Sequence, residues 1–258
     1  METITGKYIW IIGGSSGIGK ALAEHLAEQG AKIAVSARRS DLVQTVVDGL
    51  NGDGHLALPM DVVDVDAFDD ALGQMQSTWP RIDSVLFLPA IYDFHSSARK
   101  DIAFIHKAID VNFKAALTTT EKMIPVFEGQ GHGQIVLCGS IAGYRGLPNG
   151  QPYCATKAAI ANYAESLKIE MEPKNIDVKL ISPGFVETPL TDKNDFPMPF
   201  IIPAAKAAQI IAKGVVSRPF EIHFPKKTTY TMKLVQLLPN PLYFMVSRFM
   251  VKRMRDGR

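Results

Sequence analysis

The sequence predicts an α/β protein: one doubly wound parallel sheet in a single domain, followed by a helical extension at its C-terminal end. Three observations lead to this prediction. A glycine-rich stretch at residues 11–19 follows an apolar run and precedes a helical pattern. Apolar runs of strand length alternate with helical patterns along most of the chain. With 258 residues, 47% of them hydrophobic, the chain can bury one large core.

The glycine-rich stretch has the sequence IIGGSSGIG. Its glycines let a strand turn sharply into a helix whose first N–H groups can meet a phosphate without interference from a Cβ. The stretch therefore predicts a dinucleotide-binding loop, although a glycine-rich turn can also close a strand-to-helix connection without a ligand. The cofactor-binding candidates in this loop are Gly13, Ser15, Ser16, Gly17, Ile18 and Gly19.

The next two elements bear on the choice of cofactor. An apolar stripe at helical spacing over residues 21–27 ends at Gly30, and residues 32–37 form the pattern of a buried strand. Folds that bind NAD usually carry an acidic residue at the end of this strand, whereas a guanidinium accommodates the 2′-phosphate of NADP. Here the position offers Ala37 and then Arg38, followed by Arg39. The cofactor is therefore predicted to be NADP(H); a pair of solvated arginines is the alternative.

A helical pattern at residues 42–50 leads to a strand at residues 55–60. Asp61 and Val62 lie just past this strand, at the edge where open parallel sheets bind ligands. They are therefore candidates for the cofactor site. Asp61 could instead cap the next helix, but Asp64 is better placed for that role.

The remaining elements follow in chain order. A helix at residues 65–79 ends at Pro80, a strand at residues 82–88 ends at Pro89, and a long helical pattern at residues 101–127 is interrupted late by Pro125, before a turn at residues 129–133. Asn112 lies in the middle of this helical pattern, where an asparagine is usually a surface residue. Strands are then expected at residues 134–140, 177–182 and 220–224, with helices that begin at Tyr153 and span residues 204–216.

Tyr153 and Lys157 are four residues apart on one predicted helix, so their side chains share a face. Ser140 ends a strand at the same edge of the sheet as the glycine-rich loop. A phenol has an ordinary pKa of about 10, and a nearby ammonium favours its ionised form. Tyr153 could then act as general acid in reduction and as general base in oxidation, while Ser140 hydrogen-bonds the substrate oxygen. Tyr-x-x-x-Lys pairs also arise by chance on amphipathic helices. The prediction therefore depends on the combination of this pair with the glycine-rich loop, the serine and the order of strands.

Together these motifs resemble the short-chain dehydrogenase/reductase family, whose domain is Rossmann-like. The family's Thr-Gly-x-x-x-Gly-x-Gly loop is similar to residues 12–19, and the resemblance covers about residues 5–225. Its aspartate beside the adenine, its catalytic asparagine, its serine and its Tyr-x-x-x-Lys pair are matched by Asp61, Asn112, Ser140, Tyr153 and Lys157. Its Pro-Gly motif, followed by a threonine that meets the nicotinamide amide, is similar to PGFVET at residues 183–188, which adds Pro183, Gly184, Val186 and Thr188 to the cofactor-binding candidates.

The resemblance implies roles and an assembly. Asn112 would hold a water that connects Lys157 to bulk solvent, and Lys157 would also hold the nicotinamide ribose. The helices that carry Asn112 and Tyr153 would build a homodimer or homotetramer.

The chain departs from the family pattern at two linked places. The family threonine in the loop is Ile12 here, and the Asn-Asn-Ala-Gly segment after the fourth strand is replaced by FLPA at residues 87–90. In the family these groups form a polar fastening between neighbouring strands. Replacing both partners of a buried hydrogen bond with apolar groups can be nearly neutral, so the fold is expected to remain intact. The backbone path beside the nicotinamide ribose is expected to change, because Pro89 removes an N–H and Ala90 adds a Cβ.

Two C-terminal segments bear on the substrate and on partners. Residues 191–203, rich in proline and aromatic residues, are either an apolar pocket wall or an ordinary ordered loop.

Residues 226–258 form a basic amphipathic helical extension beyond the catalytic domain at residues 1–225, with helical patterns at residues 226–238 and 241–254. Such an extension could lie in an anionic membrane interface, or it could cover the substrate cleft or a partner subunit. The sequence of this extension contains the apolar residues Leu242, Met245, Val246, Phe249 and Met250, and the basic residues Lys233, Arg248, Lys252, Arg253 and Arg255, with Asp256 as its acid.

Composition limits the other classes of function. A net charge of +2 creates no global field for nucleic acid. Cys138 and Cys154 form neither a metal-spaced cluster nor a disulfide framework, and the six histidines are scattered, so no metal site is expected. The first residues lack a secretory signal pattern and no apolar run is long enough to span a membrane, so a cytoplasmic location is expected.

The predicted function is that of an NADP(H)-dependent carbonyl reductase or alcohol dehydrogenase acting on a hydrophobic small molecule. A cofactor-binding sensor or scaffold that docks through the C-terminal extension is the main alternative. The set of Asn112, Ser140, Tyr153 and Lys157 argues against it, since a binding module needs no proton-transfer group. An epimerase or dehydratase of the related longer family would need another glycine spacing and a larger C-terminal domain.

Overall fold

The computed structural model describes residues 3–93, 101–194 and 196–256. Within these ranges a seven-stranded parallel sheet has the strand order β3-β2-β1-β4-β5-β6-β9. The order reverses between β1 and β4, which in doubly wound sheets places a ligand crevice at the carboxyl ends of these strands. The predicted α/β fold with a doubly wound parallel sheet is therefore confirmed. The strands are β1 Tyr8–Ile12, β2 Lys32–Ser36, β3 Leu56–Ala57, β4 Ser84–Phe87, β5 Gly133–Cys138, β6 Ile176–Pro183 and β9 Glu221–Phe224.

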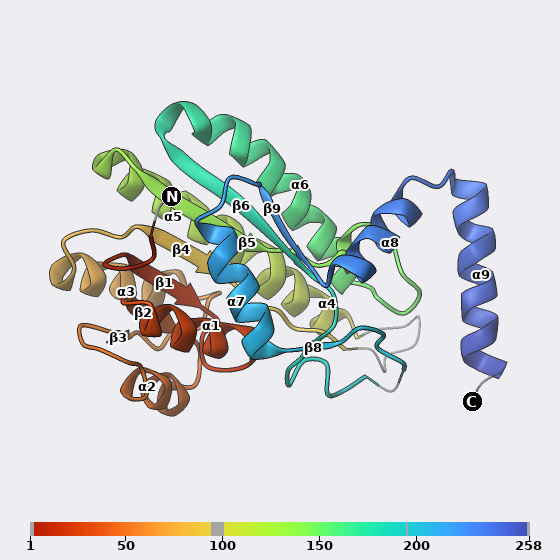
Figure 1. Ribbon diagram of the computed structural model, residues 1–258, viewed down its shortest axis with the longest axis horizontal. Coiled ribbons are helices and arrows are strands. Elements are labelled where there is room, and N and C mark those ends of the chain that lie inside the picture. The colour runs from red at the N-terminus through yellow and green to blue at the C-terminus, as the bar shows by residue number, and fades with distance from the viewer. Residues whose placement is uncertain (1–2, 94–100, 195, 257–258) are drawn as a thin grey trace.

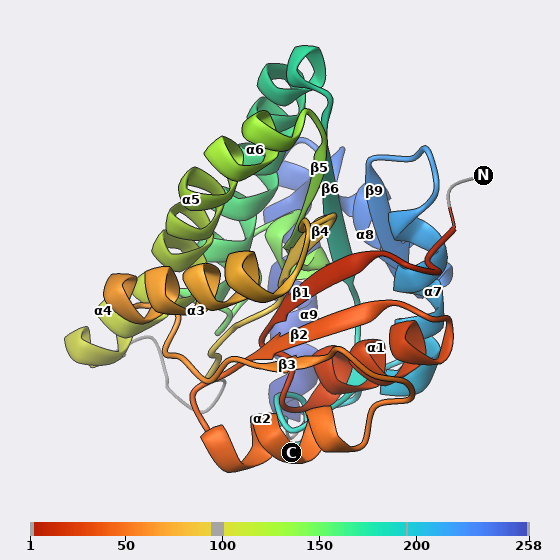
Figure 2. The ribbon, with the colours of Figure 1, turned by 90° about the vertical axis from the view of Figure 1, so that its left-hand side faces the viewer.

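Helices cover both faces of the sheet (Figures 1 and 2). Side chains alternate along β1, so Ile9 and Ile11 enter the core beneath one helical layer and Trp10 and Ile12 the core beneath the other. The first layer holds α1 Gly17–Glu28, α2 Ser40–Asp48 and α7 Ala204–Val215; the second holds α3 Val65–Thr78, α4 Ile102–Ile109, α5 Ala115–Gln130 and α6 Tyr153–Met171. Because both faces are covered, the strands read as continuous apolar runs.

Several predicted elements differ from the observed ones. The strand expected at residues 55–60 is only two residues long, although Met60 still donates a backbone hydrogen bond to Ala37 (3.0 Å) beyond its end. Pro125 does not interrupt α5, which continues to Gln130. Met123 and Phe127 on either side of the proline are fully buried, so tertiary packing outweighs the hydrogen bond that Pro125 cannot make. The turn expected at residues 129–133 accordingly begins at Gly131, whose φ of +73° ends the helix.

The long helical pattern around Asn112 is divided in three. A π-helical turn, Asp110–Lys114, separates α4 from α5. Asn112 lies in this turn and is fully buried, unlike most asparagines in the body of a helix. π-Helical turns are frequently found at functional sites. Asp64 caps α3 as expected, since its carboxylate accepts a hydrogen bond from the Ala67 N–H (3.1 Å).

The two apolar departures from the family pattern, at residue 12 and at residues 87–90, lie side by side. Ile12 and Phe87 are register partners on β1 and β4, and both are fully buried. The Leu88 N–H donates to the Ile12 carbonyl oxygen (3.0 Å), so the backbone pairing continues past the strand end. Apolar packing thus takes the place of the family's polar fastening, as expected, without leaving a buried polar side chain unpaired at these two residues.

The chain ends in two helices, α8 Lys226–Gln236 and α9 Asn240–Asp256. Figure 1 shows α9 standing apart from the body of the molecule, to which α8 connects it. A short pair of strands, β7 Val186–Glu187 and β8 Ile202–Pro203, closes the base of the loop between β6 and α7. Among the described residues, no helix is both long enough and apolar enough to cross a membrane.

Candidate active site

The glycine-rich loop is fastened to the carboxyl end of β2. The backbone N–H groups of Gly13 and Gly14 both donate to the Ser36 carbonyl oxygen, at 2.7 and 3.2 Å. The Ser36 hydroxyl in turn accepts a hydrogen bond from the Trp10 indole (2.8 Å). These bonds place the loop beside the segment that carries Arg38 and Arg39.

The loop has the shape of an anion cradle. Gly13 and Gly17 have φ values of +86° and +52°, which L-residues rarely adopt. A Cβ on Gly17 would lie 3.1 Å from the Thr188 methyl carbon, and one on Gly19 would lie 2.2 Å from the Gly13 carbonyl oxygen. Helix α1 begins at Gly17 with no side-chain cap from Ser16 and no acidic residue in its first turn. Its N–H groups are therefore suited to the diphosphate of a dinucleotide.

The adenosine end of the predicted cofactor site is formed by two neighbouring strand ends. The hydrogen bond from Met60 to Ala37 brings Asp61 and Val62 next to the segment after β2. Arg38 and Arg39 are exposed there, and within the described ranges neither arginine takes part in an ion pair. Two unpaired guanidinium groups at this corner fit a 2′-phosphate.

The nicotinamide end is predicted at the segment after β6. The Gly184 N–H donates to the Phe224 carbonyl oxygen (2.6 Å), which fastens the Pro183-Gly184 turn to β9. Thr191 holds the following residues in place, since its hydroxyl donates to Val186 (2.6 Å) and accepts from the Thr188 N–H (3.1 Å). Thr188 thereby lies against the glycine-rich loop, since a Cβ on Gly17 would be only 3.1 Å from the Thr188 methyl carbon.

Tyr153 and Lys157 occupy the first two turns of α6. Lys157 is 1% exposed, and its Nζ donates to the Cys138 carbonyl oxygen (2.7 Å) at the end of β5. The same Nζ lies 5.7 Å from the centre of the Tyr153 ring. Burial lowers the pKa of Lys157 below its usual range.

Ser140 caps a short 3-10 turn, Ile141–Gly143, in front of Tyr153. Its Oγ accepts from the Ala142 N–H (3.1 Å) and donates to the Pro183 carbonyl oxygen (3.5 Å). Burial raises the pKa of Tyr153 above its usual range, and a hydrogen bond with Ser140 opposes this rise without overcoming it. The direction is opposite to the lowering expected from the Lys157 ammonium, because desolvation is the largest effect on the phenol.

Asn112 fastens the segment after β4 to α6. Its Oδ1 accepts from the Ile91 N–H (2.7 Å), and its Nδ2 donates to the Ile91 carbonyl oxygen (2.9 Å) and to the Thr156 hydroxyl (3.3 Å). Both amide hydrogens and one lone pair of Oδ1 are therefore engaged, and the side chain links the π-helical turn to the helix that carries Tyr153.

The structure brings the predicted residues to one edge of the sheet and adds three that the sequence does not predict. The Tyr92 ring lies 5.0 Å from the Tyr153 ring, centre to centre. Thr156 and Cys138 hold Asn112 and Lys157, as described above. Thr156 lies on α6 between Tyr153 and Lys157. Its position three residues after Tyr153 could have predicted that it lies at the site. Tyr92 follows β4 without any periodic signal, and Cys138 acts through its backbone.

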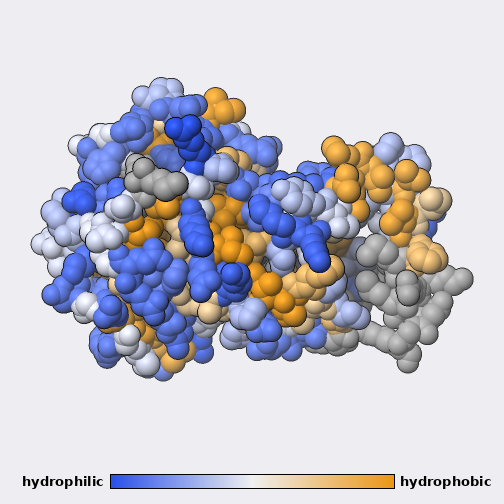
Figure 3. Space-filling view, viewed as in Figure 1, coloured by the Kyte–Doolittle hydropathy of each residue, from blue (hydrophilic) through white to orange (hydrophobic). Residues whose placement is uncertain are grey.

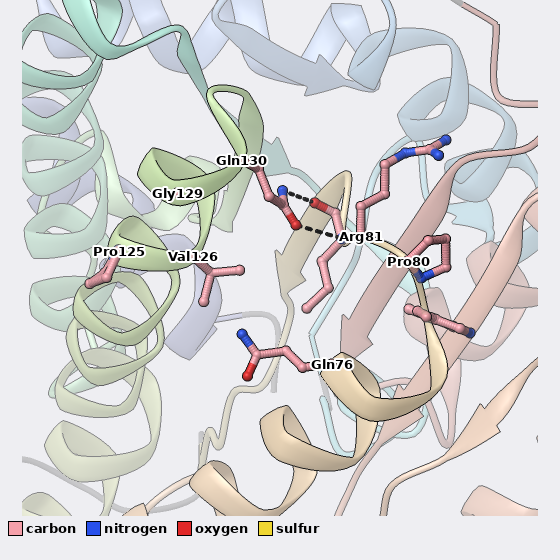
Figure 4. A pocket seen from close by; sticks show the side chains of 9 residues that line it. Gln76, Pro80, Arg81, Pro125, Val126, Gly129 and Gln130 are labelled. Carbon is pink, nitrogen blue, oxygen red and sulfur yellow. Dashed lines mark hydrogen bonds between the residues drawn. The ribbon is translucent and has the colours of Figure 1, made fainter.

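A separate hollow lies between the C-terminal ends of α3 and α5 (Figure 4). The Gln130 amide crosses it and pairs with both backbone groups of Ile82, at 2.9 Å each. This hollow is at the amino-terminal edge of the sheet, and none of the predicted site residues lines it. Its lining residues are Gln76, Trp79, Pro80, Arg81, Ile82, Pro125, Val126, Gly129 and Gln130.

Comparison with known proteins agrees with this geometry. The family model for short chain dehydrogenases matches residues 7–197. An uncharacterized oxidoreductase of Myxococcus xanthus (strain DK1622) is 30% identical over 250 residues, which cover 96% of this chain and 99% of that protein. An uncharacterized oxidoreductase of Staphylococcus aureus (strain MRSA252) is 30% identical over 191 residues, 74% of this chain and 83% of that protein.

Solved structures are similar over most of the chain. A short-chain type dehydrogenase/reductase from Mycobacterium marinum has a TM-score of 0.77 at 26% identity, covering 86% of this chain and 95% of that one. A 3-ketoacyl-(acyl-carrier-protein) reductase from Brucella melitensis, complexed with NADH, has a TM-score of 0.79 at 24% identity, covering 86% and 97%. At that identity the second likeness concerns the fold alone.

Proposed function

The chain belongs to the short-chain dehydrogenase/reductase family, and from this premise we propose that it is an NADP(H)-dependent oxidoreductase that interconverts a carbonyl group and an alcohol on a hydrophobic small molecule. One observation carries the proposal. Tyr153 and Lys157 share the start of α6, with Ser140 beside them, at the same sheet edge as the glycine-rich loop. A scaffold without turnover needs no such arrangement.

The residues divide the chemistry between them. The bound cofactor would supply or accept the hydride at the carbonyl carbon. Tyr153 would donate its phenolic proton to the carbonyl oxygen during reduction and take it back during oxidation. Ser140 would donate a hydrogen bond to the same oxygen as negative charge develops on it.

Lys157 and Asn112 would supply the proton path behind Tyr153. The buried Lys157 ammonium would stabilise the phenolate that forms after proton transfer and would hold the nicotinamide ribose. Asn112, held in the π-helical turn, would position the water that connects Lys157 with bulk solvent. This path returns the proton that each turnover removes from Tyr153.

The preference for NADP(H) rests on the segment between β2 and α2. Arg38 and Arg39 are exposed and unpaired among the described residues, and no acidic side chain occupies the position that would hold a ribose 2′-hydroxyl. We place Arg38 on the 2′-phosphate, with Arg39 beside it.

The hydrophobic substrate class rests on the loop between β7 and β8. The rings of Phe185 and Phe196 lie 5.9 Å apart at this loop, and Phe200 is 56% exposed. We propose that this loop borders the substrate site, where phenyl rings would favour an apolar substrate chain. We further propose that the protein is a homodimer or homotetramer, assembled through the helices of Asn112 and Tyr153. We propose a reducing cytoplasmic location, in which Cys138 and Cys154 stay free thiols.

The test is NADPH oxidation by the purified protein across ketones and aldehydes of increasing chain length. Activity that rises with chain length supports the proposed reductase. Tight NADPH binding without turnover across the panel would favour a cofactor-binding sensor instead.

A further inference from the structure

The two C-terminal helices expose apolar stripes that the body of the chain does not cover. Tyr230 and Leu234 on α8 and Leu237, the residue that caps its C-terminal end, have side chains that are 56, 68 and 79% exposed. Their spacing of four and three residues places them on one helical face. On α9 the side chains of Leu242, Met245 and Phe249 are 44, 59 and 67% exposed and follow the spacing three and four. Figure 3 shows apolar side chains gathered at this end of the molecule.

Charge is concentrated in the same segment. The sequence from residue 226 onward contains Lys226, Lys227, Lys233, Arg248, Lys252, Arg253, Arg255 and Arg258, against Asp256 as its one acid. The whole chain has a net charge of only +2. The part before residue 226 is therefore net acidic, and the positive charge of this protein belongs to its C-terminal helices.

The outward orientation of α9 is fixed at its first turn. Tyr243 is 6% exposed, its hydroxyl donates to the Gly146 carbonyl oxygen, and the Arg145 guanidinium lies 4.5 Å from the centre of its ring. Arg145 also donates to Leu238 (3.0 Å) and to the Asn240 side chain (2.8 Å). Because Tyr243 faces the body, the stripe of Leu242, Met245 and Phe249 faces away from it.

We propose that the exposed faces of α8 and α9 dock on an anionic lipid surface. Bulky apolar side chains flanked by basic ones match the interface of an anionic bilayer, where the apolar groups enter the acyl boundary and the cations meet the headgroups. A nucleic acid offers no apolar phase for Leu237 or Phe249. A second copy of the chain would bring two basic surfaces face to face in an isologous contact.

This surface adjoins the loop between β7 and β8, which we propose to border the substrate site. Lys227 on α8 lies 5.5 Å from the centre of the Phe200 ring, which belongs to the loop between β7 and β8. A docked molecule would hold that loop close to the lipid.

The test measures co-sedimentation of the full chain with vesicles of phosphatidylcholine, with and without phosphatidylglycerol. We expect binding to the anionic vesicles alone, weakening as salt is raised. Arg248→Glu should weaken binding at least fivefold, because each basic residue near an anionic surface contributes about that factor. The double variant Met245→Ser/Phe249→Ser should weaken it more than tenfold. Circular dichroism checks that each variant folds.

Matched controls lie on the body of the molecule. Ile169 is 74% exposed on α6 and Lys206 is exposed on α7, so Ile169→Ser and Lys206→Glu make the same chemical changes elsewhere. Both should bind vesicles as the native chain does. The proposal is overturned if the native chain does not sediment with anionic vesicles, or if the controls lose as much binding as the α9 variants. It is also overturned if Met245→Ser/Phe249→Ser converts an oligomer to a monomer in light scattering, which would assign the surface to a second copy.

Discussion

Lys157 Nζ donates a hydrogen bond of 2.7 Å to the backbone carbonyl oxygen of Cys138, so the second turn of α6 is tied to the carboxyl end of β5. This bond links the helix that carries Tyr153 to the strand that leads into Ser140. Among the residues that the structure describes, the ammonium has no carboxylate partner, and it is nearly inaccessible to solvent. Its charge is therefore available to the phenol and to a cofactor bound beside it.

Replacing Tyr153 with phenylalanine removes the proton that the proposed reaction needs. We expect turnover with NADPH to fall by a factor of about 100 to 10,000, the usual contribution of a general acid. The NADPH dissociation constant should change little, because the ring remains in place against Tyr92. Tyr163→Phe is the matched control, since Tyr163 lies on the same helix. Equal activity of the Tyr153 variant and this control would contradict the assigned mechanism.

The pH dependence of the two directions should differ. Burial raises the pKa of Tyr153, so the phenol stays protonated through the neutral range. Reduction needs the protonated form, and its kcat/KM should stay level until the alkaline range. Oxidation needs the phenolate, and its kcat/KM should climb about tenfold per pH unit below that pKa. Steady-state profiles in both directions check this; oxidation that is already at its plateau in mild acid would contradict it.

The sequence predicts well the sheet, the crossover helices and the edge of the sheet at which the candidate site lies, because apolar periodicity and glycine spacing are local signals. It does not predict the π-helical turn at Asn112, since that turn depends on hydrogen bonds to Ile91 and Thr156, which are distant in sequence. The continuity of α5 through Pro125 likewise depends on buried neighbours. The direction of the Tyr153 pKa shift follows from burial, which no residue spacing reports.

Gly17 should be intolerant of a side chain. Its φ of +52° costs an L-residue about 1–2 kcal/mol, and the added Cβ would lie 3.1 Å from the Thr188 methyl carbon. We expect Gly17→Ala to lower the free energy of unfolding by that amount and to weaken NADPH binding at least tenfold, measured by denaturant titration and by nucleotide fluorescence. Gly73→Ala in α3, where a Cβ meets nothing within 4 Å, should instead leave binding unchanged and add up to about 1 kcal/mol. Similar effects of both substitutions would argue against a cofactor cradle at Gly17.

Arg38 should decide between the two nicotinamide cofactors. Losing a charge-assisted hydrogen bond costs about 1.5–3 kcal/mol, which corresponds to a roughly 10- to 150-fold loss in kcat/KM with NADPH for Arg38→Asp. The value with NADH should stay the same or rise, because the new carboxylate can hold a ribose 2′-hydroxyl. Arg218→Asp, at an exposed position after α7, controls for the change in net charge. An unchanged ratio of NADPH to NADH activity would contradict the placement of the 2′-phosphate at Arg38.

Arg145 should couple the C-terminal helices to the catalytic segment. Its guanidinium donates to Leu238 and Asn240 and lies over the Tyr243 ring, while its backbone stands between Ser140 and Tyr153 in the chain. Arg145→Ala removes all three contacts and should lower the free energy of unfolding by about 1–3 kcal/mol. Amide hydrogen exchange in α9 should accelerate, and kcat should fall severalfold with an unchanged dissociation constant for NADPH, because the cofactor loop is not touched. Arg145→Lys should recover only part of this, since an ammonium cannot reproduce the planar fork. Faster exchange in α9 with an unchanged kcat would show that the contacts fasten the tail without positioning the catalytic segment.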